Sequence, residues 1–186
     1  MVTRLAYQKG VDLLVQSMRT LAGEGVQLAL LGSGDPQIER ELTQLARQLP
    51  ESVSISFGYD DALSHRIIAG ADVVGVPSRY EPCGLTQLYG LRYGSLPVVH
   101  AVGGLADTVV DASEANLKAD RATGFSFVNA TEAALHAALH RAQRLHADPP
   151  RWQQVMRRAM AQDFSWDEAA ARYLDLFRSV LRRLAR

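Results

Sequence analysis

The feature that most constrains the fold is a regular alternation of helical and strand patterns along most of the chain. Residues 11–21 place apolar side chains on one helical face, and residues 26–31 form a short apolar run that ends at Gly32. A short, mostly apolar run of this kind is typical of a strand buried on both faces of a parallel sheet. The alternation continues with helical patterns at 36–49, 62–71 and 85–93 and with strand patterns at 53–57, 72–77, 96–99 and 125–128.

Strands and helices that alternate with short connections predict right-handed crossovers and a sheet covered on both faces. We therefore expect an α/β fold with a doubly wound parallel sheet, that is, a Rossmann-like domain. Asp35 is placed to cap the helix that begins at Pro36. Ligands of such sheets bind at the carboxyl ends of the strands. The expected site is therefore formed by the loops at 4–10, 32–35, 58–61, 77–84 and 100–105.

The chain length favours one domain, because 186 residues can bury one core well and are few for two. We expect a single domain over residues 1–186, with an α/β core at 1–130 and a helical extension at 131–186. The final helix, from about Ser165, carries a broad apolar stripe. We expect this stripe to pack on the domain's own sheet. The alternatives are docking on a partner domain and self-association.

The charge balance argues against a polyanionic partner. Lys and Arg number 20, as do Asp and Glu, so the formal net charge is zero and nucleic acid is not an expected partner. The single cysteine, Cys83, excludes an internal disulfide, and no apolar stretch or leader pattern indicates membrane insertion or secretion. We expect a cytoplasmic protein with no membrane partner. Residues 1–4 look like a strand end that leads into a loop, which predicts a piece of a longer protein.

The five histidines are not arranged as an expected metal site. His136 and His140 have i, i+4 spacing on a predicted helix, but no acidic ligand or general base follows the metalloprotease pattern. We expect the histidines to be surface residues, and we expect no bound metal.

The loop before the helix at 85–93 has the residue types that suit an anion. Gly84, Leu85 and Thr86 leave backbone N–H groups free at a helix start, where the helix dipole favours a phosphate. Elsewhere the signals are weaker. Glycines such as Gly32 and the pair Gly103 and Gly104 are common in tight turns and are ambiguous, and Tyr59 is suited either to stack on a base or to cover the edge of the core.

Charged residues at the same predicted sheet edge suggest chemistry on a phosphorylated substrate. Glu81 would lie beside the reacting carbon, and Arg4 and Lys9 would neutralise a leaving diphosphate as it gains charge. The alternative is that Glu81 is a solvated turn residue and that the two cations are ordinary surface charges. The residue pattern by itself predicts an anion- or nucleotide-binding α/β domain.

A longer pattern takes the prediction further. The string SRYEPCGLTQLYGL at residues 78–91 resembles the signature of bacterial and plant glycogen and starch synthases. The resemblance extends over nearly the whole chain, with matching segments at 4–5, 8–10, 30–35, 64–67, 70–72, 103–109 and 163–166. Members of that family have the GT-B architecture, in which two Rossmann-like domains face a cleft. This sequence resembles only the second, carboxy-terminal domain.

The resemblance implies transfer of glucose from ADP-glucose to the non-reducing end of an α-1,4-glucan, with retention and without a metal or cofactor. By the same resemblance, Arg4 and Lys9 bind the diphosphate and stabilise the leaving ADP, and Glu81 is a catalytic residue beside the glucose. The other expected donor-site residues are Gly32, Tyr59, Cys83, Gly84, Leu85 and Thr86, with the last three offering N–H groups to the distal phosphate and Tyr59 stacking on adenine.

Two other functions remain open at the level of sequence. One is a noncatalytic nucleotide-binding or regulatory module, and the other is a GT-B relative that uses a different sugar nucleotide. Since the acceptor would bind through the domain that is not in this sequence, we expect the isolated chain to bind ADP or ADP-glucose weakly and to transfer no glucose.

Overall fold

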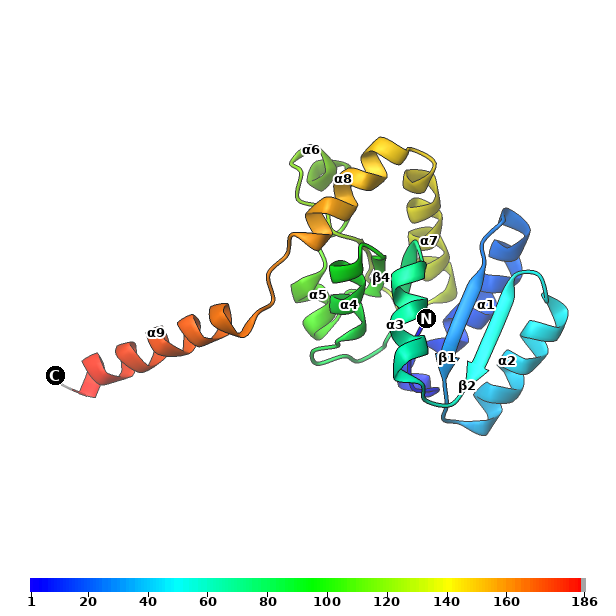
Figure 1. Cartoon of the computed structure of the whole chain (residues 1–186), viewed down its shortest axis with the longest axis horizontal. Coiled ribbons are helices and arrows are strands. Elements are labelled where there is room, and N and C mark those ends of the chain that lie inside the picture. Colours follow the sequence, from blue (N-terminus) through cyan, green and yellow to red (C-terminus); the bar gives the residue numbers. More distant parts are fainter. Residues whose placement is uncertain (185–186) are drawn as a thin grey trace.

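The computed structural model describes residues 1–184, apart from the side chain of Glu168, and it confirms the predicted α/β fold with parallel strands (Figure 1). Two parallel ladders are formed. Their strands are β1 (Leu28–Gly32) with β2 (Val53–Phe57), and then β3 (Val73–Val76), β4 (Leu96–His100) and β5 (Phe125–Phe127) in that order. Since β4 lies between two partners, all of its residues are buried.

The amino-terminal residues extend the first ladder on the edge of β1 opposite β2. Val2 and Leu5 form parallel bridges with Leu31 and Gly34, respectively. The chain then turns through a short 3-10 helix, η1 (Tyr7–Lys9), into the first long helix. The predicted loop at 4–10 is therefore anchored beside a core strand.

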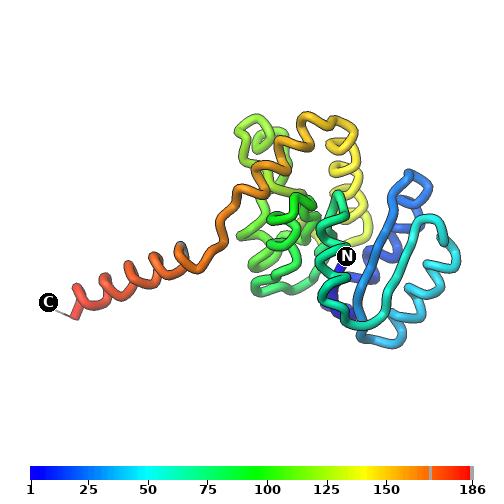
Figure 2. Tube along the Cα trace, in the orientation of Figure 1, coloured from blue at the N-terminus to red at the C-terminus, as the bar shows by residue number. Residues whose placement is uncertain are grey.

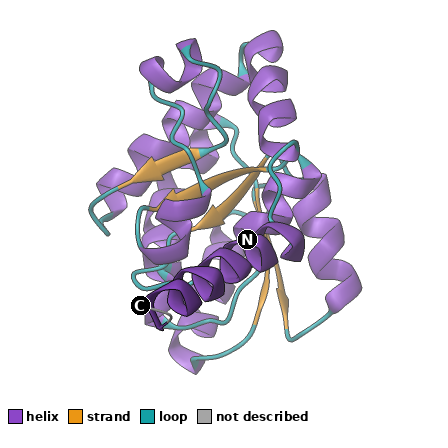
Figure 3. Cartoon of the chain, turned by 90° about the vertical axis from the view of Figure 1, so that its left-hand side faces the viewer, coloured by secondary structure: helices purple, strands orange, loops and turns teal. Residues whose placement is uncertain are grey.

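Helices cover both faces of the strands (Figure 3). Their bounds are α1 (Val11–Leu21), the 3-10 helix η2 (Ala22–Glu24), α2 (Pro36–Gln48), α3 (Asp61–Gly70), α4 (Thr86–Tyr93), α5 (Gly103–Thr108), α6 (Glu114–Lys118), α7 (Glu132–His146), α8 (Pro149–Met160) and α9 (Trp166–Leu184). The predicted start of α2 is confirmed, because the Asp35 carboxylate accepts a hydrogen bond from the Gln37 N–H at 2.7 Å and Pro36 takes the first helical position.

Helices α7 and α8 belong to the main hydrophobic core. Leu135 and Ala138 of α7 are buried in the same cluster as β5, and the Trp152 ring of α8 lies parallel to the Phe125 ring with centroids 6.3 Å apart. Helix α7 packs against β4 and β5, and α8 packs against α4 and β4. These two helices therefore close the flank of the second ladder.

Helix α9 contradicts the expectation that it packs on the domain's own sheet. It projects from the rest of the chain (Figures 1 and 2), and its large apolar side chains are exposed, including Trp166, Phe177 and Leu181. The flank of β4 and β5 is occupied by α7 and α8, so it is not free to receive the stripe. Self-association of α9 stays a prediction. Within residues 1–184, no helix is both long and apolar enough to cross a membrane.

Candidate functional site

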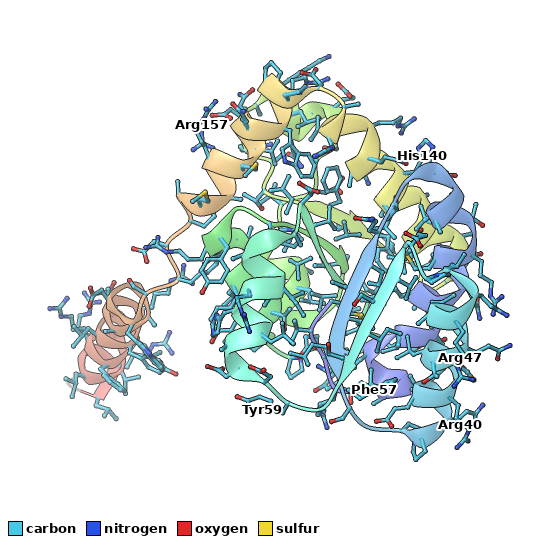
Figure 4. All side chains as sticks on the ribbon, turned by 45° about the vertical axis from the view of Figure 1, so that its right-hand side comes forward. Arg40, Arg47, Phe57, Tyr59, His140 and Arg157 are labelled. Carbon is cyan, nitrogen blue, oxygen red and sulfur yellow. The ribbon has the colours of Figure 1, made fainter. Side chains whose placement is uncertain are left out.

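The loops predicted to form the site do meet at one edge of the strands. Because all the strand pairs are parallel, the carboxyl ends of β1, β2, β3 and β4 point the same way within each ladder. Figure 4 shows Phe57 and Tyr59 at the carboxyl end of β2. The loop after β3 and the turn at η1 are joined by direct contacts, and these define the centre of the candidate site.

Lys9 and Glu81 form the central contact. The Lys9 Nζ lies 2.5 Å from the Glu81 Oε2, although the two residues are 72 positions apart. Both side chains are largely buried, at 16% and 11% exposed, and the Ser78 hydroxyl donates a second hydrogen bond to the same carboxylate oxygen at 3.1 Å. A partly desolvated ion pair of this geometry holds its two groups far more firmly than an exposed pair.

Gly10 allows the two loops to approach this closely. It ends η1 with a φ of 67°, and a Cβ atom added there would lie 2.1 Å from the Pro77 carbonyl oxygen. Only glycine satisfies both the left-handed backbone and the missing space. The sequence QKG at 8–10 therefore places Lys9 beside the loop that follows β3.

A third loop contacts the backbone of Glu81. The Gly104 N–H donates to the Glu81 carbonyl oxygen at 3.1 Å, and a Cβ on Gly103 would lie 2.2 Å from that oxygen. Steric exclusion of a Cβ atom therefore explains why Gly103 and Gly104, which were ambiguous in the sequence, are both glycine. They let the start of α5 pack directly on the loop at 77–84.

The start of α4 is open to an anion. Gly84 has a φ of 79°, and Leu85, at the N-cap, offers no side-chain hydrogen bond to the first turn. The N–H groups of that turn lie at the positive end of the helix dipole. Buried Gln87 holds the loop in place, since its side-chain amide donates to the carbonyl oxygens of Cys83 and Gly84 at 2.9 and 3.0 Å.

The side chains of Arg4 and Tyr59 are not part of this central group of polar contacts. Among residues 1–184, no hydrogen bond or ion pair joins the side chain of Arg4 or Tyr59 to Lys9 or Glu81. Tyr59 is 88% exposed, with its hydroxyl 3.5 Å from the Asp61 carboxylate.

Cys83 lies on the same loop as Glu81, and Gly32 lies at the end of β1. The Cys83 thiol is free and exposed. Gly32 ends β1, where an added Cβ would lie 2.0 Å from the Thr3 carbonyl oxygen. This close approach accounts for glycine at the start of the loop at 32–35.

One buried histidine at the site was not predicted from the sequence. His100 was expected on the surface, and this was wrong: it ends the central strand β4, so it is enclosed by the loops on either side. Its Nδ1 lies 2.8 Å from the Ser78 carbonyl oxygen and its Nε2 lies 2.8 Å from that of Val128. A neutral imidazole can donate to only one of the two. The position at a strand end was the available signal.

The fold and the place of the candidate site define a class of α/β protein with parallel strands, in which the site lies at the carboxyl ends of the strands. The family model for Glycosyl transferases group 1 matches residues 1–157, and the chain belongs to this family. The glycogen synthase of Haemophilus influenzae (strain PittEE) is 55% identical over 177 residues, which cover 95% of this chain and 37% of that protein. The glycogen synthase of Edwardsiella ictaluri (strain 93-146) is 54% identical over 180 residues, which cover 97% and 38%.

Solved structures agree with this assignment. The catalytic domain of starch synthase IV from Arabidopsis thaliana, bound to ADP and acarbose, is 36% identical with a TM-score of 0.86 and covers all of this chain and 38% of that one. The C-terminal domain of a glycosyl transferase group 1 family protein from Francisella tularensis, at 16% identity and a TM-score of 0.67, supports the fold alone. The chain spans little more than a third of the length of these curated relatives.

Proposed function

We propose that this chain is the donor-binding part of a retaining glucosyltransferase that takes glucose from ADP-glucose and adds it to the non-reducing end of an α-1,4-glucan. The observation that carries the proposal is the contact between Lys9 and Glu81 beside the open start of α4. A cation, a carboxylate and free helix N–H groups at one sheet edge suit a sugar diphosphate. The similarity to glycogen synthases supports glucose and ADP as the particular groups.

The charges divide naturally between the two halves of the donor. Lys9 has three N–H donors, so it can keep its bond to Glu81 while contacting a diphosphate oxygen. The exposed side chain of Arg4 would add a second cation, and the two would stabilise the ADP leaving group as negative charge develops. Glu81 would face the glucose, where its carboxylate stabilises positive charge at the reacting carbon or attacks it.

The rest of the donor would bind along the same edge. The N–H groups of Gly84, Leu85 and Thr86 would hold the distal phosphate at the start of α4. Exposed Tyr59 would stack on adenine. Cys83 and Gly32 would line the donor site.

We propose further that residues 1–186 form one donor-binding domain of a cytoplasmic two-domain enzyme, with the glucan acceptor bound by a part of that enzyme outside this sequence. The chain spans 37% of the Haemophilus relative, which leaves ample length for a second domain. Because glycosyl transfer needs both reactants to be positioned and water to be excluded, the chain alone should bind donor and transfer no glucose.

Calorimetric titration of the purified chain with ADP, ADP-glucose and UDP-glucose tests the proposal. We expect selective binding of the two adenine compounds, weakened about tenfold or more by Lys9→Ala because a charge-assisted contact is lost. The matched control is Lys118→Ala, since Lys118 is exposed on α6, and it should leave binding unchanged. Selective binding of UDP-glucose would indicate a relative with another donor. An absence of binding, or an equal effect of the two lysine substitutions, would contradict the proposed site.

A further inference from the structure

We propose that Arg79 is a positioning residue for this donor site, and that it acts by holding the loop that carries Lys9 against the loop that carries Glu81. The inference rests on the proposed function, since it assigns a role toward the same diphosphate. Arg79 lies two positions before Glu81, on the loop after β3, and its side chain reaches back to the opposite loop.

The guanidinium group of Arg79 makes contacts on both sides of Lys9 in the sequence. Its two terminal nitrogens each lie 2.7 Å from one oxygen of the Asp12 carboxylate, and one of them also donates to the Tyr7 carbonyl oxygen at 2.8 Å. The guanidinium carbon lies 3.7 Å from the centre of the Tyr7 ring. Because Tyr7 opens η1 and Asp12 lies in the first turn of α1, one side chain fixes both ends of the turn that presents Lys9.

Two further hydrogen bonds to backbone carbonyl groups join the same two loops. The Arg79 N–H donates to the Gln8 carbonyl oxygen at 2.8 Å, and the Gln8 side-chain amide donates to the Tyr80 carbonyl oxygen at 3.0 Å. The two loops are thus paired residue by residue from Tyr7 to Lys9. The Lys9 to Glu81 contact is the last of this series and the one that would face the ligand.

Charge argues that Arg79 positions the loops and does not bind the phosphates itself. Its guanidinium is matched by the Asp12 carboxylate in a two-point ion pair, with the side chains 20% and 27% exposed. Hydrogen bonding to Asp12 raises the pKa of Arg79 above its ordinary value, so the group stays charged and paired. Its guanidinium already donates hydrogen bonds to Asp12 and Tyr7, and a lysine ammonium could not make the same two-point contact.

The chain contains a matched ion pair elsewhere, which serves as a control for stability alone. Arg141 contacts both oxygens of Asp111 at 2.8 Å, with side chains 30% and 27% exposed, and its guanidinium carbon lies 5.7 Å from the Phe125 ring. This pair ties α7 to the segment before α6. It has the same chemistry as the Arg79 pair but touches neither loop of the site.

The test compares Arg79→Met with Arg141→Met, because methionine keeps an apolar stem and removes the guanidinium. ADP binding by the full chain is measured by calorimetry, in the original sequence and in the Lys9→Ala background. We expect Arg79→Met to weaken ADP binding about fivefold to tenfold and Arg141→Met to change it less than about twofold. Arg79→Lys should weaken ADP binding less than Arg79→Met does, but it should not restore the original affinity. In the Lys9→Ala background, Arg79→Met should have an effect of less than about twofold, since its action passes through Lys9.

Hydrogen exchange at the Arg79 amide gives a readout that needs no ligand. Arg79→Met should speed exchange at this amide and at Lys9, and Arg141→Met should not. Equal weakening of ADP binding by the two methionine variants, an undiminished effect without Lys9, or unchanged exchange in Arg79→Met would each overturn the positioning role. If the original chain binds no ADP while Arg79→Met still speeds exchange at the two loops, then the proposed function fails and the loop-pairing role of Arg79 stands.

Discussion

Replacing Gly10 by alanine should separate the two loops that bring Lys9 to Glu81. The added methyl group would lie 2.1 Å from the Pro77 carbonyl oxygen, and real Cβ contacts essentially never fall below 3.0 Å. Backbone atoms on both sides prevent a simple side-chain adjustment. The loops must therefore move apart by about 1 Å, a displacement large enough to impair a site that depends on exact placement.

The magnitude has two parts that can be measured separately. Alanine at a φ of 67° costs about 1–2 kcal/mol of stability relative to glycine. Stretching the 2.5 Å contact between Lys9 and Glu81 should in addition weaken ADP binding about tenfold, because a charge-assisted hydrogen bond is lost. The first effect comes from the backbone alone, and the second requires the clash with Pro77.

Gly25→Ala provides the control. Gly25 has a φ of 81° at the end of η2, and an added Cβ there meets nothing within 4 Å. Thermal unfolding should show a loss of about 2–8 °C for Gly25→Ala, and a greater loss for Gly10→Ala. Calorimetry with ADP should show weaker binding for Gly10→Ala only.

Two results would refute this reasoning. If Gly10→Ala and Gly25→Ala weaken ADP binding by the same factor, then the effect is general destabilisation and not separation of the loops. If Gly10→Ala lowers stability but leaves ADP affinity unchanged, then the Lys9 to Glu81 contact does not contribute to the diphosphate site.

Two further predictions concern His100 and α9. His100→Asn keeps an N–H donor near the Nδ1 position and should preserve ADP affinity. His100→Gln keeps a donor near the Nε2 position but loses the contact with the Ser78 carbonyl oxygen, so it should weaken ADP binding about fivefold in calorimetry. If His100→Asn weakened ADP binding more than His100→Gln, then His100 would not act through Ser78. Ending the chain after Arg172 removes mostly exposed side chains of α9, so the free energy of unfolding should change by less than about 0.5 kcal/mol in urea titrations. A loss of about 2 kcal/mol or more would mean that α9 packs on the domain.

The local structure of this chain followed from short-range patterns. The apolar run before Gly32, the helical spacing from residue 11 to residue 21 and the cap at Asp35 each depend on neighbours within a few positions. Periodicity and capping act over that range. The parallel arrangement then followed from the alternation of elements, and it placed the loops of residues 4–10 and 77–84 at one sheet edge.

Such short-range patterns could not predict the contacts inside the candidate site. Arg79 reads as an ordinary loop charge, and nothing near it in sequence identifies Asp12 as its partner. His100 reads as a polar residue that should prefer solvent, but the strands beside β4 and the carbonyl groups of Ser78 and Val128 enclose it.

Helix α9 is a second feature whose tertiary contacts the sequence pattern could not predict. Its apolar stripe correctly predicted an amphipathic helix, but the pattern carries no information on which surface is free to receive it. That depends on α7 and α8, which bury Leu135 and Trp152 and occupy the nearby flank. The sequence by itself thus determined the elements, their parallel order and the loops of the site. The tertiary structure decided which side chains meet there and which apolar face remains exposed, because those outcomes depend on packing between segments far apart in the chain.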